Sequence, residues 1–174
     1  MKILFVRHGE TNLNNPRRMQ GISDNELNEN GIKQANIVKK IINNEDVDLI
    51  IVSPLKRAMQ TAEIINSKIN KKIIIDDRIK EMDYGLLEGE IYSKDYWNMG
   101  YDYKSINGEN ILDFQERIYK FIEDIKVKYK NKNILIVSHG GVARIFRCYF
   151  EGIPEDRNLA DYGIANCEIK EFKI

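Results

Sequence analysis

The chain contains two histidines, and each follows a short apolar run in nearly the same local pattern. His8 follows Ile3–Val6 and one polar residue, His139 follows Ile134–Val137 and one polar residue, and a glycine comes next in both cases. Imidazole titrates near neutral pH, so it can act as a general base, a metal ligand or a covalent nucleophile. The matching patterns predict that both rings belong to one catalytic site.

Two arginines are placed to accompany these histidines. Arg7 precedes His8 in the chain, and Arg57 lies in the first turn of a helix expected to begin behind Ser53 and Pro54. A helix amino terminus favours anions, and a guanidinium fork pairs with two phosphate oxygens. A metal site would need more histidine, cysteine or carboxylate ligands than two histidines provide. These residues therefore favour phosphoryl transfer to a neutral imidazole over a metal centre.

Strand and helix patterns alternate along the chain. Apolar runs bounded by polar and turn residues predict strands at Lys2–Arg7, Leu49–Ser53, Lys72–Asp76, Asn133–Ser138 and Cys167–Ile174. Apolar residues at helical spacing predict helices around residues 35–42, 55–65, 111–129 and 142–149, the second with Ser53 as N-cap and Pro54 at the first helical position. The alternation predicts an α/β fold, a three-layer α/β/α sandwich with a mainly parallel sheet. Both histidines then fall beyond the carboxyl ends of strands, where such sheets bind ligands.

Residues 83–110 do not fit this alternation. The segment is rich in glycine, tyrosine and acidic residues, and it is expected to form a short lid-like insertion over the sheet rim. Its aromatic side chains could stack on a ring of the substrate, or they could pack the segment onto the domain: Tyr84, Tyr92, Tyr96, Trp97, Tyr101 and Tyr103. Asp95 and Asp102 among them argue against a highly anionic substrate such as a bisphosphate.

Composition narrows the class of protein. A chain of 174 residues with 43% hydrophobic residues is expected to form one domain, residues 1–174, without disulfides or metals. Its 27 basic and 27 acidic residues cancel, so neither nucleic-acid binding nor adsorption to an anionic membrane is expected. The first apolar stretch is interrupted by Arg7 and Glu10, and no apolar run reaches membrane-spanning length. We expect a cytoplasmic protein.

Taken together, these motifs resemble the histidine phosphatase superfamily, in the branch of the cofactor-dependent phosphoglycerate mutases and small-molecule acid phosphatases. The resemblance covers nearly the whole chain and rests on motifs in order: Arg7-His8-Gly9-Glu10-Thr11, Asn14, Gln20-Gly21, Asp24, Leu27, Gly31, Gln34-Ala35, Ser53-Pro54-Leu55, Arg57-Ala58, Gln60-Thr61-Ala62, Glu81, Gly85, Glu88-Gly89, Gly108-Glu109 and Ser138-His139-Gly140-Gly141.

The resemblance implies a role for each matched residue. His8 would be the nucleophile that takes the phosphoryl group, and Glu81 the proton donor. The other roles are a cationic pocket formed by Arg7, Arg57 and a protonated His139, a hydrogen bond from Asn14, and contacts at the mouth from Gln20, Gly21 and Gly140. No metal or other cofactor is implied. Asp83 and Glu88 are candidates for the acidic neighbours that would raise the pKa of Glu81.

The chain departs from the mutases of this branch. Those enzymes carry a longer insertion with paired basic residues, whereas residues 89–108 here offer only Lys94 and Lys104. A short, open site favours hydrolysis, so a phosphatase of small phosphomonoesters is predicted. The alternatives are a cofactor-dependent phosphoglycerate mutase and a protein phosphohistidine phosphatase, although the latter tend to lack a donor of the Glu81 type. Asn110 replaces a common serine, which could weaken a helix cap or a phosphate contact. The oligomeric state stays open, and the edge strand Cys167–Ile174 could pair across a homodimer.

Overall fold

The computed structural model describes residues 1–173, and its centre is a five-stranded sheet. The strands are β1 (Lys2–Arg7), β2 (Leu49–Val52), β3 (Lys72–Ile75), β4 (Ile134–Ser138) and β5 (Ile169–Lys173). Their order across the sheet is β3-β2-β4-β1-β5. The first four are parallel and β5 runs antiparallel to β1. The mainly parallel sheet is confirmed; Ile174, at the end of the last expected strand, lies outside the described residues.

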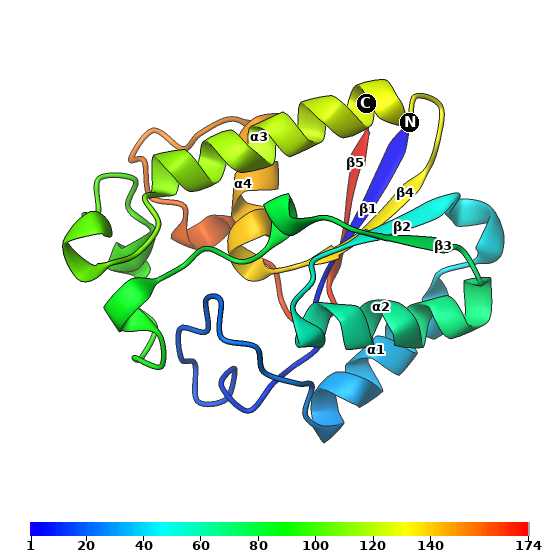
Figure 1. Cartoon of the computed structure of the whole chain (residues 1–174), viewed down its shortest axis with the longest axis horizontal. Helices are drawn as coiled ribbons and strands as arrows, with labels where there is room; N and C mark the ends of the chain where they lie inside the picture. Colours follow the sequence, from blue (N-terminus) through cyan, green and yellow to red (C-terminus); the bar gives the residue numbers. More distant parts are fainter. Residues whose placement is uncertain (174) are drawn as a thin grey trace.

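Within residues 1–173, four α-helices cover the two faces of this sheet. They are α1 (Glu29–Ile41), α2 (Lys56–Ile69), α3 (Ile111–Lys128) and α4 (Gly140–Glu151). Figure 1 shows α3 and α4 above the sheet and α1 and α2 below it. Alternate residues of β1 serve the two layers: Ile3 and Phe5 pack into the core with α3 and α4, and Leu4 and Val6 into the core with α1 and α2. The three-layer α/β/α sandwich is therefore confirmed.

The start of α2 differs from the expectation. Leu55 is the N-cap and the helix begins at Lys56, so Ser53 does not cap it and Pro54 is not its first residue. The carboxylate of Asp24, from the loop after β1, instead accepts a hydrogen bond of 2.7 Å from the Lys56 N–H. The acceptor for this helix terminus comes from a loop distant in sequence, so no residue near Ser53 marks the true start. For this reason the local spacing predicted the start of α2 at the wrong residue. Arg57 still lies in the first turn.

The register of the sheet brings the two histidines together. Arg7 pairs with Ser138 in the parallel β1–β4 ladder, so His8 and His139 leave adjacent strands at the same level. Their ring centroids are 5.2 Å apart. Val52 pairs with Val137 on the other side of β4, which places Ser53 beside His139. Three neighbouring carboxyl ends therefore supply the floor of one site.

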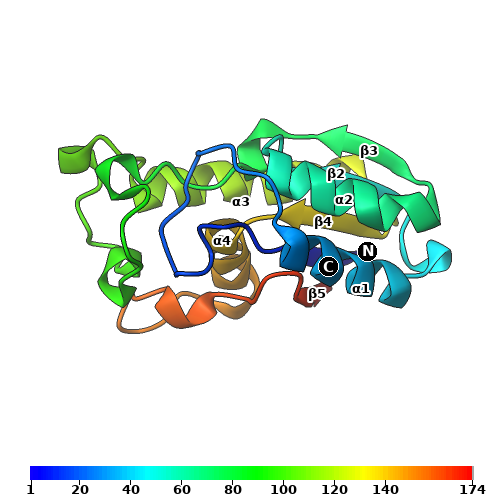
Figure 2. The ribbon, with the colours of Figure 1, turned by 90° about the horizontal axis from the view of Figure 1, so that it is seen from below.

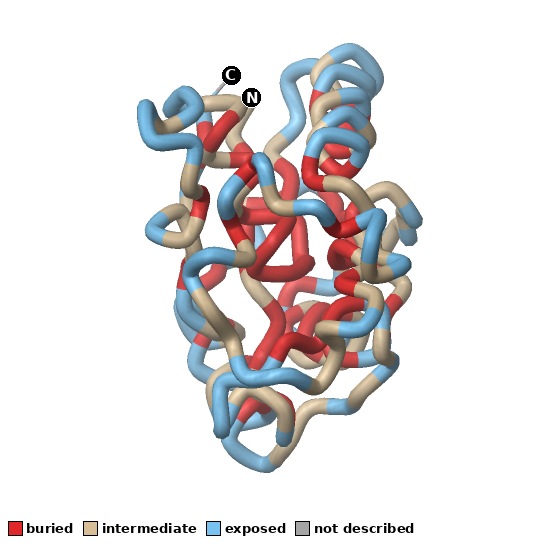
Figure 3. Tube along the Cα trace, turned by 90° about the vertical axis from the view of Figure 1, so that its left-hand side faces the viewer, coloured by how far each residue is buried: buried red, intermediate tan, exposed pale blue. Residues whose placement is uncertain are grey.

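Residues 83–110 extend beyond this end of the sheet. They form three short 3-10 helices, and Tyr84, Trp97 and Tyr103 are buried in the core on the α3–α4 side. The segment pairs with the amino-terminal loop through an Arg18–Ile91 bridge. Figure 2 shows it at the end of the molecule where the 8–28 and 152–166 connections also run. In Figure 3, which looks onto that end, exposed loops surround buried backbone.

The helix after this segment begins with a well-formed cap. Asn110 is the N-cap of α3, and its side-chain oxygen accepts a hydrogen bond of 2.8 Å from the Leu112 N–H. Asparagine is among the preferred N-cap residues, so it takes the place of serine without weakening the cap. Asn110 does not line the cavity described below. Of the two expected effects of this replacement, the weakened cap is wrong.

Candidate active site

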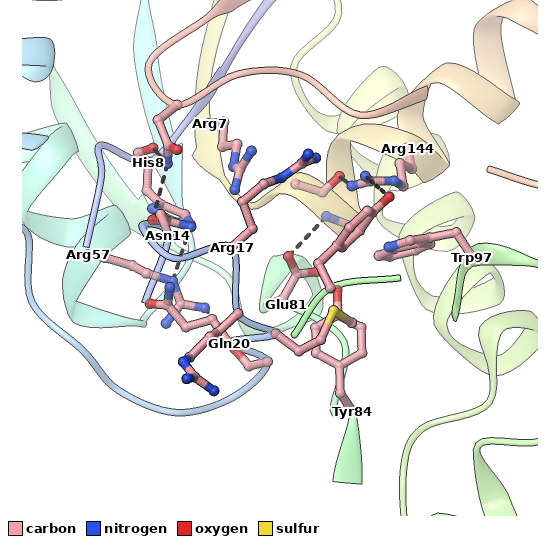
Figure 4. A pocket seen from close by; sticks show the side chains of 17 residues that line it. Arg7, His8, Asn14, Arg17, Gln20, Arg57, Glu81, Tyr84, Trp97 and Arg144 are labelled. Carbon is pink, nitrogen blue, oxygen red and sulfur yellow. Dashed lines mark hydrogen bonds between the residues drawn. The ribbon is translucent and has the colours of Figure 1, made fainter. Parts of the chain in front are cut away.

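A cavity of about 170 Å³ opens beyond the carboxyl ends of β1 and β4 (Figure 4). Its 17 lining residues include most of those singled out from the sequence. They are Arg7, His8, Asn14, Arg17, Arg18, Met19, Gln20, Gly21, Arg57, Glu81, Tyr84, Tyr92, Trp97, Gly140, Gly141, Arg144 and Asn166. His139 does not line it and lies fully buried against His8. The site is small, rich in cations, and drawn from segments far apart in the chain.

His8 is held as a neutral imidazole with one defined tautomer. Its Nδ1 lies 2.7 Å from the carbonyl oxygen of Gly9, which can only accept, so Nδ1 carries the proton. The lone pair is then on Nε2, to which Arg57 Nε donates at 3.3 Å. Burial, followed by the charges of Arg57 and Arg7, holds the pKa of His8 well below its usual 6.5. The ring therefore presents an unprotonated Nε2 beside a guanidinium at neutral pH.

Arg57 is fixed by the loop that follows β1. The buried guanidinium donates from Nη1 to the Ser23 carbonyl at 2.6 Å and from Nη2 to the Gly21 carbonyl at 2.7 Å. That loop is in turn held by Glu88, whose carboxylate accepts from the N–H groups of Ile22 and Ser23. Gly21 is required here, because it has φ +45° and a Cβ would lie 2.0 Å from Glu88 Oε1. The expected first-turn arginine thus points at His8 in a rigid frame.

His139 differs from its expected role as a charged member of the pocket. Burial, followed by the charges of Arg57, His8 and Arg7, holds its pKa well below 6.5, so the ring is neutral in the ligand-free protein. Its Nε2 lies 2.7 Å from Ser53 Oγ, whereas Nδ1 is buried without a partner among residues 1–173. Ser53 Oγ accepts from the Leu55 N–H at 3.4 Å and can donate its own proton to Nε2. When Ser53 donates in this way, the ring proton is on Nδ1, where it can be donated to an anion.

We expect the two buried histidines to make stability depend on pH. Their native pKa values lie well below 6.5, so the unfolded chain takes up protons first as the pH falls below that value. The free energy of unfolding should therefore decrease on acidification, by at most about 1.4 kcal/mol per pH unit for each histidine. Urea unfolding at several pH values between 7 and 5 measures the slope. The variant His8→Asn should reduce this slope by the contribution of about one proton. An identical slope in the variant and the wild type would show that His8 titrates normally.

Arg7 and Asn14 each keep polar atoms available at the cavity. Arg7 Nη1 donates to the Ile164 carbonyl at 2.7 Å, while its buried Nε has no partner among the described residues. Burial, followed by the charge of Arg144, lowers the pKa of Arg7 to about 10, so the group stays charged at neutral pH. Asn14 Oδ1 accepts from the Thr11 N–H at 2.9 Å, which leaves its amide nitrogen to donate into the cavity.

Gln20 and Gly140 occupy two further parts of the lining. Gln20 donates from Nε2 to Thr11 Oγ1 at 2.7 Å, and its buried Oε1 has no partner among residues 1–173. Gly140 is the first residue of α4, so its N–H is one of the unpaired donors at that helix terminus. A Cβ there would lie 3.3 Å from Arg7 Nε. The glycine therefore lets the guanidinium lie against the helix start.

Glu81 is a buried carboxylate held at the start of α4. Its Oε2 accepts from the Gly141 N–H at 2.9 Å and its Oε1 accepts from the Met82 N–H at 3.0 Å. Arg117, paired with Glu109, donates to the Glu81 carbonyl at 3.1 Å and so fixes the backbone. The expected acidic neighbours, Asp83 and Glu88, have their carboxylates occupied by backbone N–H groups elsewhere.

We expect Gly141→Ala to disable this carboxylate. A Cβ at this position would lie 2.1 Å from Glu81 Oε1 and 2.8 Å from the Trp97 ring, so the carboxylate must move. Because the resemblance implies that Glu81 is the proton donor, turnover of an alkyl phosphate should fall by about 100-fold when it is displaced. Steady-state kinetics alongside circular dichroism measure activity and folding. The control is Gly100→Ala, where a Cβ would meet only Asn98 Oδ1 at 3.2 Å; equal activity in both variants would contradict the account.

Several lining residues escaped the sequence reasoning. Besides Arg7 and Arg57, the sequence pointed only to Lys94 and Lys104 as cations near the site, and these pair with Asp161 and Asp113. The additional cations come from elsewhere: Arg17, Arg18 and Arg144. Arg144 lies one helical turn after Gly140, a spacing that could have identified it. Asn166, which donates to the His8 carbonyl at 2.9 Å, has no local sequence signature.

Among residues 1–173, no group of three or more histidine, cysteine, aspartate or glutamate residues is arranged to hold a metal ion. None of the helices described is both long and apolar enough to cross a bilayer. The functional groups gathered at the site are an imidazole with an unprotonated Nε2, fixed guanidiniums and one carboxylate. Such a set defines an enzyme acting on phosphate esters.

Comparison with known proteins agrees with that class. The family model described as "Histidine phosphatase superfamily (branch 1)" matches residues 3–174. Phosphoserine phosphatase 1 of Hydrogenobacter thermophilus is 31% identical, over 100% of this chain and 85% of that protein. The probable phosphoglycerate mutase GpmB of Yersinia pestis is 32% identical, over 97% of this chain and 83% of its own length. The structure of Bacillus stearothermophilus YhfR superposes with a TM-score of 0.89 at 27% identity, covering 99% of this chain and 91% of YhfR.

The chain belongs to the histidine phosphatase superfamily. The resemblance drawn from its motifs is confirmed over the same span. The phosphatases among its relatives make it a phosphoric monoester hydrolase.

Proposed function

We propose that this enzyme hydrolyses small phosphomonoesters, without a metal, through a phosphohistidine on His8. The observation that carries the proposal is the tautomer of His8. Its Nδ1 proton is fixed on the Gly9 carbonyl and its Nε2 lone pair points to Arg57, in the same cavity as the Glu81 carboxylate. A nucleophile, a cation and an acid–base group are thus within one small enclosure.

The proposed reaction has two displacements at phosphorus. In the first, His8 Nε2 forms a bond to phosphorus as the ester P–O bond breaks, and the Glu81 carboxyl gives its proton to the departing alkoxide. In the second, the Glu81 carboxylate takes a proton from water, the hydroxide attacks phosphorus, and the P–N bond breaks to restore neutral His8. Orthophosphate then leaves, and no oxidant, reductant or metal enters the balance.

The remaining residues would neutralise and orient the phosphoryl group. Arg7 and Arg57 supply fixed positive charge to the equatorial oxygens, and Asn14 and His139 supply neutral donors. His139 Nδ1 is buried without a partner, so an oxygen that reached it would satisfy an otherwise unpaired group. We assign the mouth of the site to Gln20, Gly21 and Gly140, the last through its helix-terminal N–H.

Residues 83–110 are proposed as the segment that closes the site and selects the substrate. Tyr92 and Trp97 line the cavity, but Arg17 lies over the Tyr92 ring at 5.0 Å and Arg144 over the Trp97 ring at 4.4 Å. Because a guanidinium already covers one face of each ring, stacking on a substrate ring is the weaker of the two interpretations. The name of the Hydrogenobacter relative suggests phosphoserine as one candidate substrate. We propose a small-molecule phosphate ester as the partner, and no nucleic acid or membrane.

Phosphate release from a panel of esters, with EDTA present, tests the proposal. The panel includes p-nitrophenyl phosphate, O-phosphoserine, sugar phosphates, nucleotides, α-ribazole phosphate and phosphoglycerates. Hydrolysis that survives EDTA and disappears in His8→Ala supports the proposed mechanism. Interconversion of 3- and 2-phosphoglycerate in the presence of 2,3-bisphosphoglycerate would replace it with a mutase, and release from a phosphohistidine protein alone would replace it with a protein phosphatase.

A further inference from the structure

Two arginines that the proposed reaction does not use, Arg17 and Arg144, line the cavity on the side opposite Arg57 in Figure 4. Arg17 is exposed, and its guanidinium has no hydrogen bond or ion pair with residues 1–173; it lies over the Tyr92 ring. All five of its N–H groups are therefore available to a ligand. In the figure its guanidinium lies between those of Arg7 and Arg144.

The guanidinium of Arg144, unlike that of Arg17, is held in place by hydrogen bonds to the backbone. It donates from Nε to the Leu159 carbonyl at 3.1 Å, from Nη1 to the Gly140 carbonyl at 3.0 Å and from Nη2 to the Ala160 carbonyl at 3.3 Å. Its guanidinium also lies over the Trp97 ring. No carboxylate of residues 1–173 forms an ion pair with it. The structure thus fixes a partly buried cation at the site with neutral partners only.

These arginines form the wall between the inner cavity and a second, outer one. The outer cavity has a volume of about 710 Å³, and it shares four lining residues with the inner cavity: Arg7, Arg17, Tyr92 and Arg144. The one carboxylate lining the outer cavity, Asp161, is paired with Lys94 at 2.9 Å. Asp95 and Asp102, whose acidity argued against anionic substrates, line neither cavity. The passage from the phosphate pocket outward is therefore positively charged.

The charges divide into two groups along this passage. Arg57 and Arg7 are the cations that lower the pKa of His8, so they surround the position where phosphorus would bind. The charge of Arg144 instead acts on Arg7. It is the second cause, after burial, of the lowered pKa of Arg7. Two cations that repel each other across a partly buried gap are stabilised by an anion between them. A phosphate on His8 meets Arg7 and Arg57, which leaves Arg17 and Arg144 without an anion.

We propose that Arg17 and Arg144 form a subsite for a second anionic group, a carboxylate, on the alcohol part of the phosphomonoester. This inference rests on the proposed function, because it places the second group relative to a phosphate at His8. The planar fork of Arg17 suits a carboxylate, which it can pair with through two parallel hydrogen bonds. The substrate class is then a phosphorylated hydroxy acid or hydroxy amino acid of small size.

Matched substrates test the subsite without any mutation. O-Phosphoserine and phosphoethanolamine differ only by the carboxylate, as do 3-phosphoglycerate and glycerol 3-phosphate at the corresponding carbon. We expect kcat/KM to be at least about tenfold higher for the carboxylate-bearing member of each pair, the range of one charge-assisted hydrogen bond. 2,3-Bisphosphoglycerate provides the remaining arm: if it is preferred over 3-phosphoglycerate, the second group is a phosphate and the carboxylate assignment is wrong.

The variants Arg17→Gln and Arg144→Gln then assign the preference to these side chains. Each should reduce the carboxylate preference by about threefold to tenfold. Arg17→Gln is the cleaner variant, because Arg17 is exposed and its guanidinium bonds to no residue of 1–173, whereas Arg144 also holds backbone carbonyls. The control is Lys33→Gln, which removes one charge from an exposed position on α1.

Three outcomes would overturn the subsite. These are no preference within the matched pairs, a preference that survives both variants, and an equal loss for both members of a pair. Hydrolysis of p-nitrophenyl phosphate separates these from failure of the proposed function. If that hydrolysis is intact and depends on His8 while the preference is missing, the subsite alone is wrong. If no phosphomonoester is hydrolysed, the proposed function fails as well.

Discussion

Replacing the proposed nucleophile, His8→Ala, is expected to lower kcat/KM for p-nitrophenyl phosphate by about 10⁴-fold or more. The proposed reaction has no second route in this site, because in it the Nε2 lone pair is the group that forms the covalent bond. His139 is not expected to substitute for it, since its Nε2 is already bonded to Ser53 Oγ at 2.7 Å and its Nδ1 acts as a donor in the proposed mechanism. Steady-state phosphate release over a wide enzyme concentration range measures the loss.

A matched control separates this effect from damage to the loop after β1. Asn12 is exposed in the same loop and forms no hydrogen bond with residues 1–173, so Asn12→Ala should retain full activity. His8→Ala should also keep its circular dichroism spectrum, because among residues 1–173 the ring hydrogen-bonds only to the Gly9 carbonyl and to Arg57 Nε. Residual activity within tenfold of the wild type would exclude His8 as nucleophile.

Replacing the proposed acid–base group, Glu81→Gln, is expected to have the second largest effect. Turnover of an alkyl phosphate should fall by about 10²- to 10⁴-fold, because the alkoxide then leaves without a proton. p-Nitrophenolate is a good leaving group, so formation of the phosphoenzyme from p-nitrophenyl phosphate should slow much less. Its breakdown by water still needs the base. Rapid-mixing experiments should therefore show a burst of p-nitrophenol, roughly one per active site, followed by slow turnover.

Glu90→Gln is the control for this variant. Glu90 is exposed in the same segment, and its carboxylate has no hydrogen bond or ion pair with residues 1–173, so its removal should change neither the burst nor the steady state. An equal loss of Glu81→Gln activity on alkyl and p-nitrophenyl esters, without a burst, would mean that Glu81 only supports the structure around Gly141.

The sequence allowed the architecture to be predicted because its strands are continuous apolar runs. A strand that is buried on both faces is a continuous run of apolar residues, without alternating polar positions, and is easily recognised. The strands β1, β2 and β4 are of this kind. The same runs placed His8 and His139 at strand ends. The parallel register seen in the structure, with Arg7 beside Ser138, then sets the two histidines at the same level.

Features that depend on distant segments could not be predicted in this way. The N–H group at the start of α2 is bonded by Asp24, and the Arg57 guanidinium is held by carbonyl groups of residues 21 and 23. Asn166 reaches the site from the connection before β5. The neutral state of His139 depends on complete burial, which no local pattern reveals. Glu81 was found through the resemblance alone, because a single carboxylate in a loop has no distinguishing spacing.

The most direct test of the central claim is detection of the phosphoryl group on His8. The Glu81→Gln enzyme would be mixed with p-nitrophenyl phosphate, quenched in alkali to preserve a P–N bond, digested and examined by mass spectrometry. We predict one phosphoryl group on the peptide that contains His8, stable in alkali and lost on acid treatment. A phosphoryl group on another residue, or an unmodified His8 peptide from enzyme that has released a burst of p-nitrophenol, would contradict the phosphohistidine mechanism.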